Sequence, residues 1–537
     1  MPARPRTFLL ASLAGLALLA APAAAQNRVL QSFKVGDGSD RIGVFNDGTE
    51  VETAGPAAIQ TGPNGQVYVL DQVNGRILTV DGDKPAATPK AVDLPAGLAP
   101  KDLVAVDGKL YVWDGGVHAL QPGGGADGRK YEARSVGDVD DVVKSAFAQM
   151  GSQTPTDAEE ILADPGRSLG KQPEFTPIRQ FVQSRGFGAV KVDVIPGRDQ
   201  KSAQVEVRQD ADPLNAIAFP IRVTSRLGSV EILDVTQKRE VYVFVEDVPL
   251  STKQKPALYV ARYTGRGALD RIYDVPITAD QAAVRRFVTV GPKGNVLFLR
   301  SDTAEVAILD LAARQPRAQV LEPPPAKSEA FDESTPGLLT AVKPGTRSGV
   351  IQTALGFEAL KWTVTQSAYG RDPDEACVGF DRIRRPWYLQ GKLGEEVRGV
   401  PYCWGCFGSL AQFRAKIERG ARAGNVCTRE DPKRDLAGVD CSAFVSAAWG
   451  LSRQYTTRDI PSITKPLDDP WSLKPGDALN KPGSHVMLFV KFTPDRKVEV
   501  LEAATSSCNG KVCRNVYPLS VLLARGYTPV RYTALTD

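Results

Sequence analysis

The sequence predicts a multidomain protein in which an all-β N-terminal domain of repeated units precedes an α+β C-terminal domain. Three observations support this fold class. The chain has 537 residues, which is enough for several domains of ordinary size. Turn-and-strand units recur as far as Leu321, whereas all seven cysteines lie between Cys377 and Cys513. A change in both pattern and composition along one chain indicates two unlike domains.

The overall composition is that of a globular protein. Hydrophobic residues make up 42% of the chain and charged residues 24%, which excludes wholesale disorder. The 66 Lys and Arg nearly balance the 62 Asp and Glu, leaving a net charge of +4. A nucleic-acid-binding protein would show a clustered basic face. We therefore expect no nucleic acid among its partners.

Residues 1–25 are expected to be a secretory signal peptide. Arg4 and Arg6 precede an apolar run over residues 8–20, and Ala23–Ala25 supply a cleavage site of small residues. The run is shorter than the ~20 residues that a membrane-spanning helix needs. We therefore expect an exported protein, periplasmic or secreted, with no transmembrane anchor after cleavage.

Residues 26–321 are expected to form the repeated β-domain. Strong or weaker copies of a turn followed by β-strands lie at Thr61–Asp81, Val106–Trp113, Glu240–Val245 and Val290–Asp310. Tyr68 and Tyr111, in equivalent strands, are 43 positions apart, near the length of one four-stranded blade. Gly-containing turns between alternating apolar runs predict hairpins. The pattern resembles a β-propeller, an architecture that by itself implies no function.

The repeat is interrupted near residues 138–191, where helical spacing of apolar residues predicts an insertion. The aspartates in the Gly-rich turns are explained by turn chemistry without a calcium site; they are Asp37, Asp40, Asp81 and Asp83. His118 lies on an expected strand and is interpreted as a structural residue.

A Pro-rich, polar linker is expected over residues 322–345, because Glu322–Glu329 contains three consecutive prolines. Helical periodicity resumes around Val350 and Leu355. The second domain is therefore expected to span residues 346–537.

An odd number of cysteines in an exported protein leaves one thiol unpaired if the others form disulfides. Cys508 and Cys513 are close enough in sequence to close a small loop. The remaining bridges can form in three ways among Cys377, Cys403, Cys406 and Cys427. Zinc at Cys403 and Cys406 is disfavoured, because a structural site needs four Cys or His ligands and export favours disulfides. Cys441 is then the free thiol.

Cys441 precedes an apolar stretch, Ser442–Trp449, that predicts a helix. Unpaired N–H groups at a helix start favour an anion, and the thiolate is the nucleophilic form of cysteine. A buried core cysteine is the alternative for such a position.

His485 is the only histidine of this domain and begins a strongly β-like run. If the following hairpin is symmetric about Thr493 and Pro494, Glu502 lies directly across from His485. Cross-strand neighbours have Cβ atoms about 4.5–5.5 Å apart, so Glu502 would orient the imidazole. A one-residue change of register would turn Glu502 to the other face.

Four segments occur in the order typical of one family: Pro401–Gly405, Gly438–Ser442, Leu473–Asp477 and Ser484–Val486. In these motifs the C-terminal domain resembles NlpC-type cell-wall peptidases, papain-like cysteine peptidases that cleave peptide bonds in peptidoglycan stems. The resemblance covers about a third of the chain.

The resemblance implies a role for each matched residue. It makes Cys441 the nucleophile, His485 the general base, Glu502 the residue that orients the histidine, and Tyr402 a tyrosine whose hydroxyl faces the site. Substrate contacts are implied at Trp404, Asp440, Ser442 and Ser484. Glu502 departs from the His, Asn or Gln usual in the family. Cys406 replaces a usual glycine, and the stretch over residues 407–437 is longer than usual.

The function expected from these features is hydrolysis of amide bonds in peptidoglycan stem peptides, with the propeller as a docking module for a protein or wall polymer. No cofactor and no metal are expected. Two alternatives remain open: acyl transfer or amide hydrolysis on another substrate, and an inactive scaffold in which the propeller binds a partner.

Overall fold

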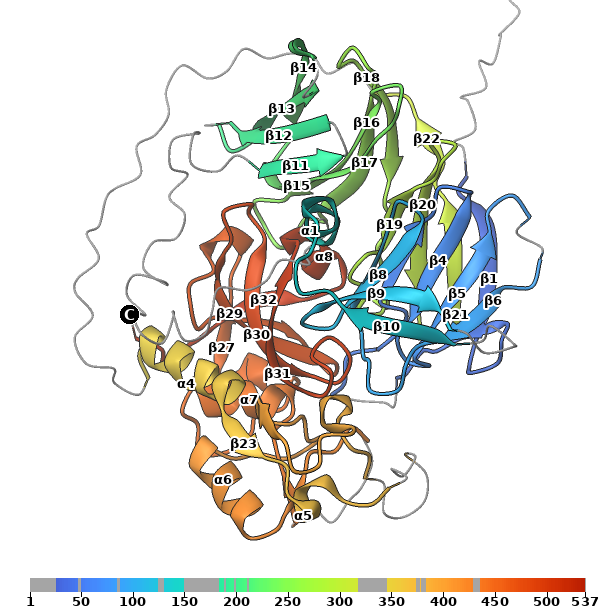
Figure 1. Ribbon diagram of the computed structural model, residues 1–537. Helices are drawn as coiled ribbons and strands as arrows, with labels where there is room; N and C mark the ends of the chain where they lie inside the picture. The colour runs from blue at the N-terminus through green and yellow to red at the C-terminus, as the bar shows by residue number, and fades with distance from the viewer. Residues whose placement is uncertain are drawn as a thin grey trace, which may run out of the picture.

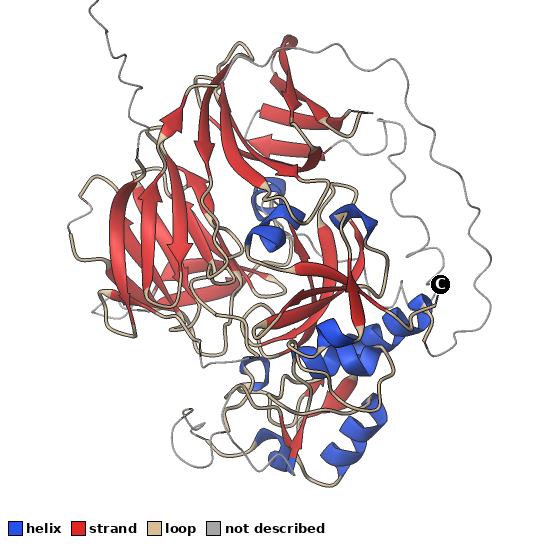
Figure 2. Ribbon diagram, turned by 180° about the vertical axis from the view of Figure 1, so that it is seen from behind, coloured by secondary structure: helices blue, strands red, loops and turns tan. Residues whose placement is uncertain are grey.

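The computed structural model describes residues 26–46, 50–84, 87–123, 130–148, 183–187, 190–197, 199–209, 212–316, 345–372, 377, 383–427 and 435–536. The expected signal peptide, residues 1–25, and all but the last residue of the expected linker, 322–345, lie outside these residues. The protein is mostly β, as predicted (Figures 1 and 2). We call residues 26–316 the N-terminal part and residues 345–536 the C-terminal part.

Five sheets make up the described N-terminal part (Figure 1). The first contains β3 (Ala58–Thr61), β4 (Gln66–Asp71), β5 (Arg76–Asp81) and β6 (Lys90–Asp93). The second contains β7 (Asp102–Val106), β8 (Lys109–Trp113), β9 (Val117–Pro122) and β10 (Tyr131–Ser135). The third contains β11 (Gln183–Phe187), β12 (Val190–Pro196), β13 (Ser202–Gln209) and β14 (Asp212–Arg222). The fourth contains β15 (Arg226–Val235), β16 (Val241–Val248), β17 (Ala257–Tyr263), β18 (Leu269–Asp274) and β22 (Ala313–Arg314). The fifth contains β19 (Val288–Val290), β20 (Val296–Ser301), β21 (Glu305–Asp310), β1 (Arg28–Val35) and β2 (Arg41–Ile42).

The hairpins predicted from the Gly-Pro-x-Gly turns are present. Gly65 and Gly294 have φ angles of 77° and 76°, in the left-handed region that glycine adopts most easily. Each turn joins two antiparallel strands, β3 to β4 and β19 to β20. Alternate residues of these strands, such as Val67 and Val69, are buried in the core.

The sheets are arranged as in a β-propeller. The first strand of one sheet contacts the first strand of the next, as β3 does with β7 and β19, and β15 with β11 and β19. Strand β1 pairs antiparallel with β21, from Arg28 opposite Asp310 to Lys34 opposite Glu305. The beginning of the chain thus completes the sheet formed by the end of the N-terminal part.

The range near residues 138–191, predicted as an insertion, needs correction at its end. It contains α1 (Asp141–Ala148), which contacts both β7 and β11. It also contains β11, which pairs with β12 as a regular strand of the third sheet. The sequence of β11, Gln183–Phe187, lacks the alternating apolar residues of the other strands. The start of this repeat unit was therefore not recognised from the sequence.

A buried ion pair links separate sheets of the N-terminal part. Arg286, just before β19, donates two hydrogen bonds of 3.0 Å to Asp102 at the start of β7. Both side chains are buried, and the same guanidinium donates to the backbone oxygen of Ala146 in α1. This pair therefore ties three elements of the ring together.

The C-terminal part contains a six-stranded antiparallel sheet with helices beside it (Figure 1). In spatial order its strands are β27 (Thr464–Pro466), β32 (Thr528–Tyr532), β28 (Ala478–Lys481), β29 (His485–Phe492), β30 (Val498–Ala504) and β31 (Lys511–Tyr517). Two smaller sheets pair β23 (Lys361–Thr363) with β24 (Glu396–Arg398), and β25 (Arg422–Ala423) with β26 (Leu436–Ala437). The helices are α4 (Arg347–Ala359), α5 (Gln366–Tyr369), α6 (Leu410–Glu418), α7 (Cys441–Ala448) and α8 (Leu519–Ala524), with single turns η3 (Trp387–Leu389), η5 (Ile460–Ser462) and η6 (Pro470–Ser472).

Helix α7 is the central helix of this part. It packs on β29, β30 and α4. Phe444 is fully buried and lies edge-on to Phe357 of α4, with ring centroids 5.6 Å apart. The helices predicted around Val350 and after Cys441 are thus confirmed, and their apolar residues fill one shared core.

The predicted disulfide Cys508–Cys513 is present. The other two bridges, which the sequence left open, join Cys377 to Cys427 and Cys403 to Cys406. Cys441 is a free, buried thiol.

The two parts pack directly against each other. Glu246 of β16 accepts a hydrogen bond of 2.9 Å from the backbone N–H of Ser520 in α8. Arg496 donates to the backbone oxygen of Leu227 at 2.9 Å. Within the described residues, no helix has both the length and the apolar character needed to cross a membrane.

Candidate active site

Cys441 lies at the first residue of α7, and Asp440 caps this helix. The Asp440 carboxylate accepts hydrogen bonds from the backbone N–H of Ala443 at 2.7 Å and of Gly405 at 2.8 Å. Gly438 makes the close approach of these segments possible, because a Cβ there would lie 2.5 Å from the Pro401 oxygen. The start of α7 is therefore fixed against the Tyr402–Cys406 loop.

His485 is the first residue of β29 and contacts Glu502 of β30. Its Nε2 atom lies 2.6 Å from Glu502 Oε2, and both side chains are buried. The other ring nitrogen, Nδ1, is then left for Cys441, with which the imidazole also forms a hydrogen bond. The three residues expected from the sequence are thus brought together.

The predicted register of the hairpin was wrong, although the predicted contact forms. Leu488 pairs with Leu501, so Glu502 lies diagonal to His485 rather than directly across from it. The turn closes with a hydrogen bond from Thr493 N to Lys497 O, further along the chain than assumed. A β-bulge between Phe489 and Lys491 then changes the register by one residue. Without this bulge, Glu502 would point to the opposite face of the sheet.

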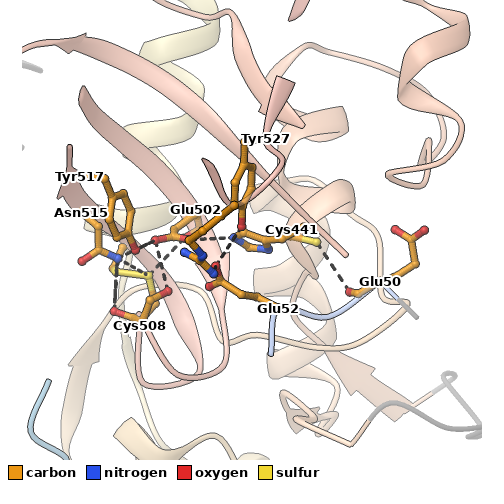
Figure 3. A network of polar contacts seen from close by, with 12 residues as sticks. Glu50, Glu52, Cys441, Glu502, Cys508, Asn515, Tyr517 and Tyr527 are labelled. Atoms are coloured by element: carbon orange, nitrogen blue, oxygen red, sulfur yellow. Dashed lines mark hydrogen bonds and ion pairs between the residues drawn. A yellow bond between two sulfur atoms is a disulfide. The ribbon is translucent and has the colours of Figure 1, made fainter. Parts of the chain in front are cut away.

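The Glu502 carboxylate is held by further hydrogen bonds that the sequence analysis did not identify. Its Oε1 atom accepts from Asn515 Nδ2 and from the Tyr517 hydroxyl, each at 2.7 Å (Figure 3). Burial alone would raise the pKa of Glu502, but the bonds from His485, Asn515 and Tyr517 lower it to about 2. Asn515 and Tyr517 are two residues apart in β31, so they lie on the same face of the sheet. This spacing is the sequence pattern that could have identified them.

The charged form of His485 is favoured in this site. Burial alone would lower its pKa, but the Cys441 sulfur and the Glu502 carboxylate together raise that pKa well above the usual value. Burial also raises the pKa of the Cys441 thiol, and the neighbouring imidazole opposes that effect. Cys441 is only 1% exposed. Admitting water to the site would therefore favour the thiolate.

Tyr402 reaches the same site from the preceding loop. Its backbone N–H donates to Gly510 O at 2.8 Å, and its hydroxyl is buried with no hydrogen-bond partner among the described residues. Burial and the nearby Cys441 sulfur raise the pKa of Tyr402 well above its ordinary value. The hydroxyl is therefore an uncharged donor available to another group.

The four predicted substrate-contact residues lie in different surroundings. Asp440 and Ser442 are buried, and both accept a hydrogen bond from Gln454, so they hold the start of α7. Trp404 and Ser484 are partly exposed and flank the site on the loops before α6 and β29. Of the four, these two remain accessible to a bound molecule.

Two acidic residues of the N-terminal part also reach the site, which the sequence analysis did not anticipate. The backbone oxygen of Glu50 lies 3.9 Å from Cys441 Sγ (Figure 3). Glu52 accepts hydrogen bonds from Arg525 at 2.7 Å and from the Tyr527 hydroxyl at 2.9 Å. About 400 residues separate these glutamates from Cys441, so no local pattern predicts the contact.

Most of the side-chain atoms that could hold a metal ion in this site already have a partner. Atoms of Glu52, His485 and Glu502 lie within 4.8 Å of one another. His485 and Glu502 are bonded to each other, however, and Arg525 places a positive charge on Glu52. Cys403 and Cys406, weighed above as zinc ligands, are bonded to each other.

No protein-family model and no curated protein matches the sequence. Several solved structures with β-propeller-like folds show weak likeness. Hydrazine synthase from Kuenenia stuttgartiensis is 14% identical over 48% of this chain and 80% of its own, with a TM-score of 0.24. A streptogramin B lyase is 12% identical over 48% and 66%, with a TM-score of 0.15. Virginiamycin B lyase from Staphylococcus aureus is 10% identical over 52% and 72%, with a TM-score of 0.16. At these TM-scores the neighbours assign no activity to this chain.

Proposed function

We propose that this chain is an exported cysteine hydrolase that cleaves an amide bond in peptidoglycan stem peptides. In this proposal the C-terminal part is an NlpC-type, papain-like catalytic domain, and the propeller-like part docks a protein or a wall polymer. The proposal rests on one observation: a free thiol at a helix start contacts a buried imidazole, which in turn contacts a buried carboxylate. That is the arrangement needed to activate a cysteine nucleophile.

Each residue has a definite task in the proposed reaction. His485 Nδ1 takes the proton from Cys441, and the thiolate attacks the carbonyl carbon of the scissile amide. The imidazolium then gives that proton to the departing amine, which leaves a thioester on Cys441. Water, deprotonated by His485, hydrolyses the thioester and restores the thiol. Glu502 remains ionised throughout because its pKa is about 2.

Negative charge on the carbonyl oxygen needs donors beside Cys441. The backbone N–H groups of Cys441 and Ser442, at the start of α7, are the candidate donors, and the positive end of the helix dipole lies at the same place. The unpartnered hydroxyl of Tyr402 is a further donor close to the sulfur.

Mass analysis of muropeptides tests the proposal directly. Purified peptidoglycan is incubated with the protein lacking residues 1–25, or with the Cys441→Ser variant as the matched control. New fragments with the first protein only would support the proposal and identify the bond. Intact walls of several stem types, with Cys441 still open to alkylation, would reject this substrate and leave another amide as the target. An inert Cys441 would favour the scaffold alternative.

A further inference from the structure

A short segment of the N-terminal part, Glu50–Glu52, lies against Cys441 and the loop before His485. The Glu50 backbone oxygen faces the Cys441 sulfur at 3.9 Å (Figure 3). The Glu50 backbone N–H donates to the oxygen of Gly483, two residues before His485, at 3.0 Å. A main-chain carbonyl next to the thiol and a main-chain hydrogen bond to the cleft wall are the contacts that a bound peptide would make.

Both glutamate side chains of this segment fit into donor sites on the C-terminal part. The Glu50 carboxylate accepts from the backbone N–H of Thr457 at 2.8 Å. The Glu52 carboxylate accepts from Arg525 and Tyr527, and all three of these side chains are buried. Charge-assisted hydrogen bonds are stronger than neutral ones, so each site favours a carboxylate over an amide.

The contacts of this segment leave buried polar atoms without partners. Glu52 is 5% exposed, yet its Oε2 atom has no hydrogen-bond partner among the described residues, and neither has the Tyr402 hydroxyl. Glu50 has a φ of 68°, which is unfavourable for a residue with a side chain. Unsatisfied buried groups and a left-handed glutamate weaken the closed arrangement, so a better-fitting ligand can displace the segment.

We propose that Glu50–Glu52 is an internal occupant of a peptide-binding cleft with two carboxylate subsites, one at Thr457 and one at Arg525 and Tyr527. The external ligand is then an acidic peptide with carboxylates two residues apart. This inference rests on the proposed function for the identity of the cleft. A covalently attached occupant has a high effective concentration, which is why the cleft is closed in the free protein.

The rate at which iodoacetamide alkylates Cys441 tests whether Glu50–Glu52 covers the thiol. In the double variant Glu50→Ala and Glu52→Ala, we expect alkylation to be faster by at least about tenfold, because the tethered occupant is lost. Glu132→Ala, which removes an exposed glutamate of β10, is the matched control and should leave the rate unchanged. Thermal melting of each variant verifies that it is folded. An unchanged rate in the folded double variant would overturn the proposal.

Two tripeptides test the carboxylate subsites. Acetyl-Glu-Val-Glu-amide, which has the sequence of the segment, should slow alkylation of the double variant by about tenfold at saturation, and acetyl-Gln-Val-Gln-amide should not. Adding Arg525→Gln to the double variant should abolish this protection. Equal protection by both peptides, or by neither, would overturn the carboxylate subsites.

These measurements need no catalytic turnover, so they separate this inference from the proposed function. Protection by the acidic tripeptide together with uncut peptidoglycan would keep the subsites and reject the reaction. Cleaved peptidoglycan without protection by the acidic tripeptide would support the reaction and reject the subsites.

Discussion

The two histidines of this chain, one in each part, make the same kind of contact in different surroundings. His118, near the start of β9 in the second sheet, lies 2.8 Å from Asp114, and the two side chains are 19% and 24% exposed. His485 lies 2.6 Å from Glu502, and these side chains are 2% and 0% exposed. Only the second pair has a free thiol on the other side of the ring.

The comparison teaches that the contact between imidazole and carboxylate does not itself make a site. In water the attraction of such a pair is weak, because solvent screens both charges. In the interior, where charges are screened less, the Cys441 sulfur and then the hydrogen bond to Glu502 raise the pKa of His485 well above its ordinary value. The C-terminal part supplies that interior with a core contributed by α4, α7 and the six-stranded sheet.

Replacing His485 should have the largest effect of any single change considered. His485→Ala should lower stem-peptide cleavage by at least about 10³-fold, since no other group accepts the Cys441 proton. Both the parent and the His485→Ala variant should carry alanine at positions 50 and 52, so that Cys441 is equally accessible in the two proteins. Turnover within a few fold of the parent would show that the assigned base is wrong.

Breaking a buried charge pair of the N-terminal part should affect stability instead. Asp102→Ala leaves Arg286 buried without its carboxylate and should lower the free energy of unfolding by about 3–5 kcal/mol. Denaturant titration measures this loss. Asp83→Ala, which breaks the exposed pair with Lys293, is the control and should cost at most about 1 kcal/mol. Equal losses would contradict the assigned importance of burial.

Removing the charge of Glu502 should make the two histidines more alike. Glu502→Gln should lower the pKa of His485, because the opposite charge next to the ring is lost. With two histidines in the chain, the imidazole signals of labelled protein can be assigned and titrated by NMR. The signals of His118 should not move. An unchanged His485 titration would mean that Cys441 alone sets its protonation.

The same pair fixes the direction of two pH effects on stability. The pKa of Glu502 is lowered from 4.5 to about 2, so its contribution to stability is present above pH 4.5 and is lost as the pH falls toward 2. The pKa of His485 is raised, so its contribution is complete below about pH 6.5 and is lost as the pH rises through the folded value.

Opening the Cys508–Cys513 disulfide should have a smaller effect, limited to the C-terminal part. The loop that it closes is short, so the replacement of both residues by serine should cost about 2 kcal/mol. Asn515 Nδ2 contacts both sulfurs and Glu502, so the double variant should also lower the pKa of His485 slightly. Unfolding of the N-terminal part, which has no cysteine, should not respond to reductant.

The smallest effect is expected for His118→Ala. Its contact with Asp114 is partly exposed, so stability should change by less than about 0.5 kcal/mol and cleavage not at all. A loss of activity in this variant would indicate a role of the propeller-like part beyond docking.

Those elements that depend on neighbouring residues were predictable from the sequence. The turn at Gly62–Gly65 and its copy at Gly291–Gly294 determine hairpins, and the apolar residues after Cys441 determine α7. The pairing of β1 with β21 was not predictable, because nothing near Arg28 identifies a partner at Asp310.

The site was predictable to the same extent. Cys441, His485 and Glu502 stand out by residue type and motif, and they do meet. The bulge that keeps Glu502 on the same face as His485 lies between Phe489 and Lys491, and the alternation of apolar and polar residues along the strand does not predict it. Glu50 and Glu52 reach the site only because the two parts pack together. The spacing of neighbouring residues in the sequence does not predict such a contact.

The closure of the fifth sheet by β1 also sets an order of events during synthesis. Strands β1 and β21 end at Val35 and Asp310, so every strand of that sheet exists before residue 345 is made. Domains generally fold as units from the N-terminus as the chain emerges. The segment that carries Glu50 and Glu52 comes after β2 in the chain, and Ala54, just beyond it, forms bridges with Phe45 and Ala283. Cys441 is therefore synthesised after the N-terminal segment whose backbone contacts its sulfur.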